Sequence, residues 1–162
     1  MKEKYVYALD LSLNSTGVCI FTNDGEFVKA VTIDTKSLDE SKLKLKMIGE
    51  EFIKLMKEYM PKVVVIEQGF TLYNKSTQAI FRVHGIANYI FCAFEQIYYP
   101  ATTVKKIVGG KGNMTKEEIR DIILERYPKI KFNSLDESDA FALAIAYFTE
   151  HGDTYAKKNF SQ

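Results

Sequence analysis

The sequence predicts a single α/β domain built around a mixed five-stranded sheet. Three short strand-like segments follow one another at the start of the chain, and helical periodicity then alternates with two further strand-like segments. With 162 residues, of which 46% are hydrophobic and 27% charged, the chain has the length and composition of one globular domain. We therefore expect one domain over residues 1–150 and a flexible C-terminal tail over residues 151–162.

The first three strands should form an antiparallel meander. Residues 5–10, 16–22 and 26–34 are rich in β-branched and aromatic residues, as strands are. The last two of these segments are joined by the sequence Asn-Asp-Gly at residues 23–25, which is a strong hairpin signal. Strands that follow one another through such short connections pair as neighbours.

Helical periodicity replaces the strand pattern after the third strand. Between residues 36 and 60 apolar residues recur at alternating steps of three and four, which predicts a long helix that ends before Pro61. Residues 62–67 read Lys-Val-Val-Val-Ile-Glu, a run typical of a strand buried on both faces. The helical spacing returns in residues 76–95, and residues 97–101 can form a short fifth strand.

Two capping signatures predict the last two helices. Residues 115–118 (Thr-Lys-Glu-Glu) have the form of a capping box, and the helix that they open should end at Tyr127. Residues 134–137 (Ser-Leu-Asp-Glu) have the same form and open an alanine-rich helix over residues 136–150. Three glycines within residues 109–112 indicate a loop ahead of these two helices.

Composition narrows the class of protein but does not name a partner. No apolar run approaches the roughly 18 residues of a membrane span, and the strand-like start leaves no room for a signal peptide. Cys19 and Cys92 are isolated, without zinc-site spacing, and we expect both to be buried, reduced thiols of a cytoplasmic protein. The net charge of +1 does not by itself indicate a nucleic-acid partner.

Two of the predicted strands end in an acidic residue. Asp10 closes the first strand, and Glu67 closes the β-branched run after a helical crossover. Because the strands of a strand–helix–strand unit run parallel, their carboxyl ends lie at the same edge of the sheet. Two carboxylates held there repel each other unless a cation lies between them, which favours a bound metal ion. The alternative is that Asp10 only begins a loop and Glu67 only marks a strand end.

A second pair of acids opens the alanine-rich helix. Asp136 and Asp139 are three residues apart and share a helix face. Asp136 and Glu137 also lie in the first turn, where acids favour the helix dipole, so Asp136 has a structural explanation too. Asp139 heads a run that is apolar on every side, and a carboxylate there should be partly buried and bound to a ligand. Oxygen ligands without His or Cys favour Mg²⁺ or Mn²⁺, and two such ions can hydrolyse a phosphodiester.

Three segments together resemble the RuvC family of Holliday junction resolvases. They read ALDLSLNSTG (residues 8–17), VVVIEQGF (residues 63–70) and LDESDAFALA (residues 135–144), in the order and at the separations of that family. The resemblance implies the RNase H-like fold, in which three antiparallel strands are followed by parallel strands in a five-stranded mixed sheet flanked by helices.

The resemblance also assigns the four acids. Asp10 matches the family's first-strand aspartate, Glu67 its second acid, and the pair Asp136 and Asp139 its closing acids. It implies that all four are catalytic and hold two Mg²⁺ ions per active site, with Mn²⁺ able to substitute. Glu137 lies between the closing acids and is the alternative ligand to Asp136.

Three further residues match the family's DNA contacts. Phe70 matches a phenylalanine that stacks at the centre of the junction, and Lys105 and Lys116 match its two functional lysines. One lysine would compensate charge on the scissile phosphate near the metal site, which makes Lys105 a catalytic candidate, and the other would contact the DNA backbone. The alternatives are that Phe70 folds back on the core and that Lys116 is a solvated residue of a first helical turn.

One segment departs from the family pattern. The usual Asp-Pro-Gly-Ser after the first strand is replaced by Asp-Leu-Ser-Leu-Asn-Ser at residues 10–15, and the missing glycine leaves the course of this loop open. Such departures resemble the divergent relatives found in phages of low-GC Gram-positive hosts. The resemblance then implies a protein that acts in the cytoplasm of a bacterial host cell, in DNA recombination and repair.

The function implied is that of a metal-dependent, structure-selective endodeoxyribonuclease that resolves Holliday junctions, and the sequence leaves open whether it also cuts other branched DNA such as forks and flaps. One alternative is a non-catalytic branched-DNA-binding module of the same fold. A second is an ATPase domain related to actin and the sugar kinases. Those proteins need glycine-rich phosphate loops, whereas bulky Leu11 and Leu13 follow Asp10 here.

Resolving a four-way junction requires two symmetric cuts, which implies a C2 homodimer. The helix expected over residues 76–95 carries Phe81, Tyr89 and Phe91 outside its main apolar stripe. This helix has more apolar surface than one face can bury, so it is our candidate for the dimer interface. The alternative is that the rest of the fold wraps around it.

Overall fold

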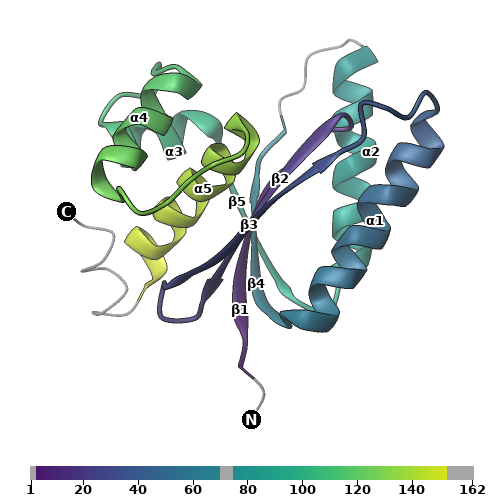
Figure 1. Cartoon of the computed structure of the whole chain (residues 1–162), viewed down its shortest axis with the longest axis horizontal. Helices are drawn as coiled ribbons and strands as arrows, with labels where there is room; N and C mark the ends of the chain where they lie inside the picture. The colour runs from purple at the N-terminus through teal and green to yellow at the C-terminus, as the bar shows by residue number, and fades with distance from the viewer. Residues whose placement is uncertain (1–2, 70–74, 153–162) are drawn as a thin grey trace.

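The structure, a computed structural model, describes residues 3–69 and 75–152, which form a five-stranded sheet covered by helices on both faces (Figure 1). The first elements are β1 (Tyr5–Asp10), β2 (Ser15–Thr22) and β3 (Phe27–Asp34). They are followed by α1 (Ser41–Glu58), β4 (Pro61–Glu67), α2 (Lys75–Ile90) and β5 (Glu95–Tyr99). The remaining elements are α3 (Ala101–Gly109), α4 (Lys116–Arg126) and α5 (Leu135–His151). Of the predicted tail, residues 153–162 lie outside the described residues.

The strand order across the sheet is β3-β2-β1-β4-β5. Pairing is antiparallel between β1 and β2 and between β2 and β3, and parallel between β1 and β4 and between β4 and β5. The predicted meander and mixed sheet are therefore confirmed. Because β1 and β4 are parallel neighbours, their carboxyl ends lie together at one edge of the sheet.

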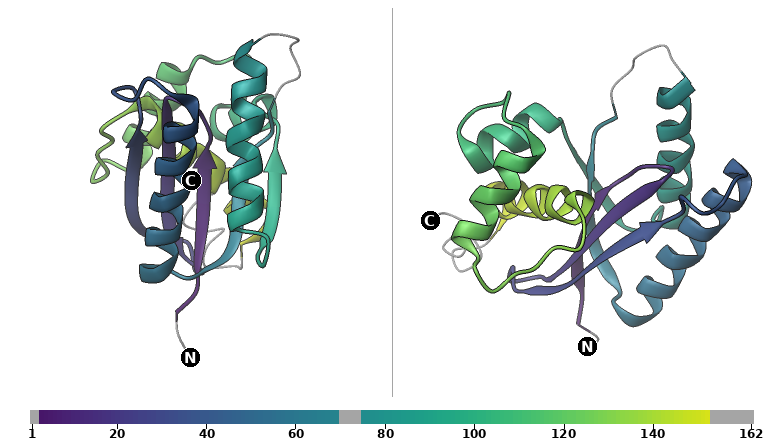
Figure 2. Two further views of the ribbon diagram at one scale, coloured as in Figure 1. Left: turned by 90° about the vertical axis from the view of Figure 1, so that its right-hand side faces the viewer. Right: turned by 45° about the horizontal axis from the view of Figure 1, so that its top comes forward.

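Each face of the sheet carries its own group of helices. In Figure 2 the helices α1 and α2 lie on one side of the sheet, and α3, α4 and α5 lie on the other. Side chains alternate between the two faces along each strand. In β1, Tyr7 and Leu9 belong to the core beneath α1 and α2, whereas Val6 and Ala8 belong to the core beneath α5. Within the described part of the chain, no helix is long and apolar enough to cross a membrane.

Two helices are shorter than their periodicity predicted. The helix expected from residue 36 begins only at Ser41, because the backbone N–H of Lys36 bonds to Asp34 Oδ1 and the segment after it forms a turn. The helix expected to reach residue 95 ends at Ile90. Glu95 pairs with Val63 instead, so strand pairing with β4 takes over from helix propagation.

The exposure of three side chains also corrects our expectations. Phe91 is fully buried beside Tyr7 and Phe52, so it is part of the core and not of an outer surface. Phe81 and Tyr89 are exposed, as the interface hypothesis requires. Cys19 is buried as expected, but Cys92 is exposed, so that prediction was wrong.

Helix α3 was not predicted, because the glycines near its end suggested a loop. It follows Pro100, whose fixed φ suits the start of a helix, and its apolar residues Val104 and Val108 pack one turn apart into the core. The helix ends at Gly109 and is capped by Gly110, which adopts a left-handed φ of 85°. The loop therefore begins only after Gly109.

The two capping boxes have different outcomes. The first is complete, since Glu118 N donates to Thr115 Oγ1 at 3.2 Å and Thr115 N donates to Glu118 Oε2 at 2.7 Å. In the second, Glu137 N donates to Ser134 Oγ at 3.2 Å, but the Glu137 carboxylate accepts from Asn133 N and not from Ser134 N. The second box is therefore only half formed, because its acid is bound elsewhere.

The first turn of α5 lies directly against β2. A Cβ atom added at Gly17 would come within 2.0 Å of the Asp136 carbonyl oxygen, a distance that no real contact reaches. A side chain at this position would therefore push the helix away from the strand. The absence of a side chain at Gly17 sets how closely α5 approaches the sheet.

Replacing Gly17 by alanine should therefore destabilise the fold. We expect Gly17→Ala to lower the free energy of unfolding by about 1–3 kcal/mol, because the methyl group overpacks the contact with Asp136. Urea denaturation followed by circular dichroism measures the change. A variant as stable as the parent protein would show that the helix end has room to move.

Candidate active site

Two acids meet where β1 and β4 end. Leu9 and Ile66 are the last aligned pair of the two strands, so Asp10 and Glu67 follow them side by side. Asp10 continues the alternation of Val6 and Ala8, which face α5, so its side chain points to the α5 side of the sheet. Glu67 continues a row on β4 that faces the same way.

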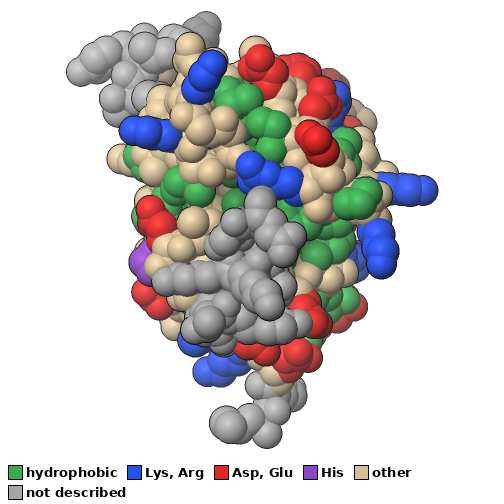
Figure 3. All heavy atoms as spheres, turned by 90° about the vertical axis from the view of Figure 1, so that its left-hand side faces the viewer, with side chains coloured by type: hydrophobic (Ala, Val, Ile, Leu, Met, Phe, Trp, Pro, Cys, Tyr) green, Lys and Arg blue, Asp and Glu red, His purple; other side chains and the backbone are tan. Residues whose placement is uncertain are grey.

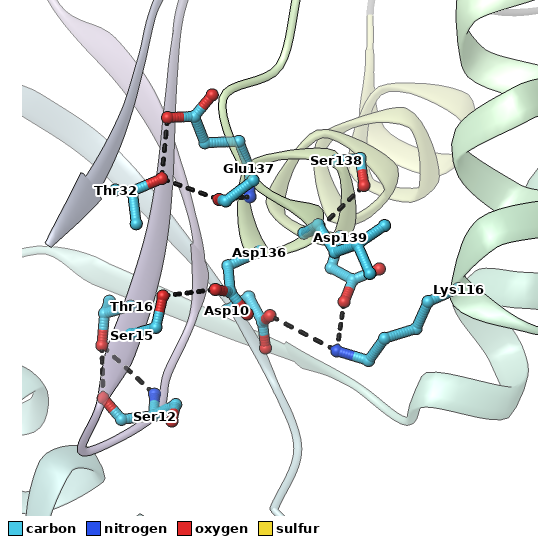
Figure 4. A network of polar contacts seen from close by, with 12 residues as sticks. Asp10, Ser12, Ser15, Thr16, Thr32, Lys116, Asp136, Glu137, Ser138 and Asp139 are labelled. Carbon is cyan, nitrogen blue, oxygen red and sulfur yellow. Dashed lines mark hydrogen bonds and ion pairs between the residues drawn. The ribbon is translucent and has the colours of Figure 1, made fainter. Parts of the chain in front are cut away.

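Helix α5 brings a second pair of acids to this edge. Its first turn carries Asp136, and Asp139 lies one turn further along. In Figure 4 the Asp136 side chain lies next to Asp10, and Asp139 faces Lys116. Asp136 and Asp139 both act electrostatically on Asp10, as does Glu67. The structure thus brings together all four acids that the sequence singled out.

Burial makes the charged state of this cluster costly. Burial raises the pKa of Asp10 well above its usual range; Lys116 partly offsets this, and the charges of Glu67, Asp139 and Asp136 add to it. Burial also raises the pKa of Glu67 and of Asp139, against an opposing effect of Lys116 in each case. The cluster therefore carries more negative charge than its surroundings compensate.

Two lysines from other helices lie beside the acids. Lys116, at the start of α4, forms an ion pair with Asp139, and its Nζ lies 3.8 Å from Asp10 Oδ2. Partial burial acts to lower the pKa of Lys116, but attraction to the carboxylates outweighs it and the pKa is raised. Lys105 of α3 lies close enough to lower the pKa of Glu67 and Asp139.

A small cavity of about 80 Å³ opens beside the cluster between α3, α4 and α5. Its polar lining consists of Glu67, Asp139, Lys105 and Lys116. Its apolar lining consists of Ala101, Val104, Ile119 and Ala142. The unpredicted helix α3 therefore forms one wall of the site and carries Lys105.

Asp136 and Glu137 point in different directions. Figure 4 shows the Glu137 side chain turned toward Thr32 on β3 and the Asp136 side chain turned toward Asp10. Glu137 is 1% exposed, and its carboxylate accepts hydrogen bonds from Thr32 Oγ1 and from Asn133 N, both at 2.8 Å. Both carboxylate oxygens of Glu137 thus already accept hydrogen bonds, and they point away from the acid cluster.

The loop between β1 and β2 needs no glycine to turn. Thr16 Oγ1 donates to Ser12 O at 2.7 Å and accepts from Ser12 N at 3.2 Å, which closes the turn from inside. Across the described part of the chain, no residue other than glycine has a positive φ. The loop is also held by Thr35 N, which donates to Asn14 O at 3.0 Å. Side-chain hydrogen bonds replace the missing glycine of the family motif.

The four acids fit a hard divalent cation as a donor set. Within residues 3–69 and 75–152, no three acidic, histidine or cysteine side chains lie close enough together to hold an ion as they stand. Lys116 instead lies against Asp10 and Asp139. The donors are all carboxylates, and burial raises the pKa of three of them, so an added positive charge would stabilise their ionised forms. Phe70, the predicted stacking residue, lies outside the described residues.

The surface around α3, α4 and α5 carries charges of both signs. Figure 3 shows Lys and Arg side chains interspersed with Asp and Glu on the part of this face that the described residues form. This distribution agrees with the overall net charge of +1. Positive charge near the acids is therefore local, and Lys105 and Lys116 supply part of it.

The electrostatics of the cluster predict that Asp10→Asn stabilises the metal-free protein at neutral pH. The folded-state pKa of Asp10 is raised, so its contribution to stability is fully present below the unfolded pKa of about 3.9 and is lost as pH rises through the folded pKa. Asparagine does not ionise, so the variant does not lose this stability as the pH rises. We expect a higher Tm in EDTA near pH 7 and no difference in acid.

Thermal unfolding of the metal-free protein at a series of pH values measures this effect. The series runs from about pH 3.5, which is below the reference aspartate pKa of about 3.9, to about pH 8. Asp39→Asn is the matched control, since Asp39 is exposed on the segment before α1 and its replacement should leave Tm nearly unchanged. A lower Tm for Asp10→Asn at neutral pH would mean that the attraction between Lys116 and Asp10 outweighs the burial of the acid.

Comparisons with known proteins agree with the geometry. The family described as crossover junction endodeoxyribonuclease RuvC matches residues 6–147. RuvC of Gluconobacter oxydans is 30% identical over 146 residues, which span 86% of this chain and 86% of the relative. RuvC of Thermomicrobium roseum is 34% identical over 112 residues, which span 65% of this chain and 67% of the relative.

Solved structures show the same fold. Thermus thermophilus RuvC in complex with a Holliday junction substrate matches with a TM-score of 0.76 and 16% identity, covering 89% of this chain and 92% of that one. The yeast mitochondrial Holliday junction resolvase matches with a TM-score of 0.56 and 11% identity, covering 98% and 82%. The predicted RNase H-like fold is thereby confirmed. By its sequence and its fold, the chain belongs to the RuvC family of crossover junction endodeoxyribonucleases.

Proposed function

We propose that this protein is a metal-dependent, structure-selective endodeoxyribonuclease that resolves four-way DNA junctions. The observation that carries the proposal is the buried carboxylate cluster formed by β1, β4 and α5 at the carboxyl edge of the sheet. Family membership supports the same activity. The protein acts on DNA in the cytoplasm of a bacterial host cell, and residues 1–150 form its one nuclease domain.

The proposed metal ligands are Asp10, Glu67, Asp136 and Asp139. They would hold two Mg²⁺ ions, for which Mn²⁺ can substitute, and such a pair activates a water molecule and stabilises the leaving oxygen of the phosphodiester. We assign Asp136 rather than Glu137 as the ligand, because the Glu137 carboxylate is bound to Thr32 and Asn133. The acids position the ions, and the reaction needs no protein nucleophile because water is the attacking group.

The two lysines have complementary proposed roles. Lys105 lines the cavity beside Glu67 and compensates charge on the scissile phosphate during cleavage. Lys116 holds its positive charge over a wide pH range, because the neighbouring carboxylates raise its pKa. By its family match we assign it to contact the DNA backbone near the cut. Phe70 follows the strand end that carries Glu67, and by its family match we assign it to stacking on a base at the junction centre.

The proposed enzyme is a C2 homodimer, because two symmetric cuts require two active sites related by a two-fold axis. Phe81 and Tyr89 are eight residues apart on α2 and lie on one side of the helix, with exposed fractions of 45% and 79%. Gly85 lies between them, and a Cβ there would meet no described heavy atom within 4 Å. This strip suits close packing against a second copy of α2.

A cleavage assay tests the function. The parent protein should introduce paired symmetric nicks into a synthetic four-way junction with Mg²⁺ or Mn²⁺, and none in EDTA. Glu67→Gln should lower the nicking rate by roughly 10²–10³-fold or more, because it weakens the hold on the ions whose positive charge stabilises the transition state. Junction binding by Glu67→Gln, measured in EDTA by gel shift, should survive.

The substrate and variant controls separate the alternatives. Linear duplex should remain uncut, and Glu125→Gln, which changes an exposed acid of α4, should cut at the parent rate. Equal cutting of forks and flaps would indicate a general branch nuclease. Binding without cleavage under any metal would instead support the non-catalytic junction-binding module.

The dimer proposal predicts that Tyr89→Lys produces monomers. A charged side chain in place of Tyr89, at one end of the strip on α2, would be buried without a partner in the dimer, which is costly. Sedimentation velocity of the variant should show half the mass of the parent protein. Ile53→Lys replaces an exposed residue of α1 and is the matched control that should remain dimeric. A dimeric Tyr89→Lys would exclude this strip as the interface.

A further inference from the structure

The first turn of α5 rests on a row of small side chains from β2. Ser15, Gly17 and Cys19 alternate along the strand and therefore face the helix. Gly17 leaves room for the Asp136 backbone, and Cys19 Sγ donates to the Glu137 carbonyl oxygen at 3.3 Å. The first turn of α5 is thus held against β2 at Asp136 and Glu137, which are the two alternative metal ligands of that turn.

Glu137 fixes the same turn to β3. Thr32 pairs with Gly17 across the strands, and its hydroxyl donates to Glu137 Oε1 at 2.8 Å. Thr32 Oγ1 also lies 2.7 Å from Ser134 Oγ, the capping oxygen of α5. Because a hydroxyl has one hydrogen, Thr32 donates to Glu137 and accepts from Ser134. These bonds fix the rotation of the helix about its own axis.

Ser15 contacts the other acid of the turn. Its hydroxyl donates to Asp136 Oδ2, and the side chain is 8% exposed at the first residue of β2. Figure 4 shows this bond on the side of Asp136 that faces away from Lys116. One carboxylate oxygen of Asp136 is therefore held by the strand, while the side chain lies next to Asp10.

We propose that Ser15 is a positioning residue for the metal site: its hydroxyl orients the Asp136 carboxylate toward Asp10. Glu137 does not compete for the site because it anchors the same turn to Thr32. The segment at residues 10–15, where the usual Asp-Pro-Gly-Ser is replaced, thus supplies a hydrogen-bond donor to the acid whose assignment the sequence left open.

A hydroxyl in this position acts through the metal ligand and not on the substrate. A carboxylate that a neighbouring donor already orients loses less rotational freedom when it binds an ion, and removing such partners typically costs 10–100-fold in metal affinity or activity. The bond leaves the charge of Asp136 in place, so the acid remains a donor for a cation. Ser15 should therefore affect how tightly metal is held, more than the rate at saturating metal.

This inference rests on the proposed function of Asp136 as a metal ligand. The test measures Mn²⁺ binding to the DNA-free protein by isothermal titration calorimetry, together with the Mn²⁺ concentration that gives half-maximal nicking. Ser15→Ala should weaken Mn²⁺ binding roughly tenfold and raise the half-maximal concentration by about the same factor. The nicking rate at saturating Mn²⁺ should fall much less.

Two further variants make the test specific. Ser12→Ala is the matched control, because it removes a hydroxyl from the same loop whose bond, from Asn14 N at 3.4 Å, does not involve an acid. It should bind Mn²⁺ as the parent protein does. In an Asp136→Asn background, Ser15→Ala should cause no additional loss, since its effect passes through the Asp136 carboxylate. Circular dichroism establishes that each variant is folded.

The outcomes separate this inference from the proposed function. Unchanged Mn²⁺ binding in Ser15→Ala, with weakened binding in Asp136→Asn, would overturn the role of Ser15 and leave the metal site intact. An equal loss on the Asp136→Asn background would also overturn it, because Ser15 would then act by another route. Unchanged binding in both variants of a protein that still cuts junctions would remove Asp136 from the ligands and the inference with it.

Discussion

The parallel pairing of β1 with β4 is the constraint on which the rest of the structure depends. It places Asp10 and Glu67 at the ends of two neighbouring strands with both side chains on the α5 side of the sheet. Carboxylates in that position are shielded from water on one side by the sheet and on the other by a helix. Helix α5 then adds negative charge beside the pair, and Lys116 and Lys105 compensate part of it.

Helix α5 can add its acids only because it approaches β2 without an intervening side chain. The contact at Gly17 brings the first turn of the helix to the sheet, and Glu137 and Thr32 lock its rotation. Positive charge comes from a separate layer, since Lys116 belongs to α4 and Lys105 to α3. The acids of β1, β4 and α5 therefore face lysines that belong to the shorter helices α3 and α4.

The places of the four acids in the fold could be predicted because strand ends and helix starts are local features. Asp10 and Glu67 could be placed from the ends of two strands and the rule that crossover strands run parallel. Helix α3 was missed because three glycines outweighed the spacing of Val104 and Val108, and only the packing of those two residues against α5 resolves the conflict.

Other features depend on contacts that no sequence pattern reveals. The choice between Asp136 and Glu137 turns on Thr32, which lies more than a hundred positions earlier in the chain and bonds to Glu137 through the pairing of β2 with β3. Ser15 likewise carried no signal of its own, because it precedes the strand predicted over residues 16–22, and a serine there is usually a loop residue. Both proposals therefore rest on long-range strand pairing and not on local propensity.

The mixed charge of the surface has a consequence for how the protein finds its substrate. Proteins that hold uniform duplex through many phosphate contacts lose affinity steeply with salt, because each contact releases condensed counterions. A chain with 22 basic and 21 acidic residues, interspersed on the face that carries α3, α4 and α5, can make few such contacts at once. We therefore expect its affinity for ordinary duplex to be low and to depend only weakly on salt.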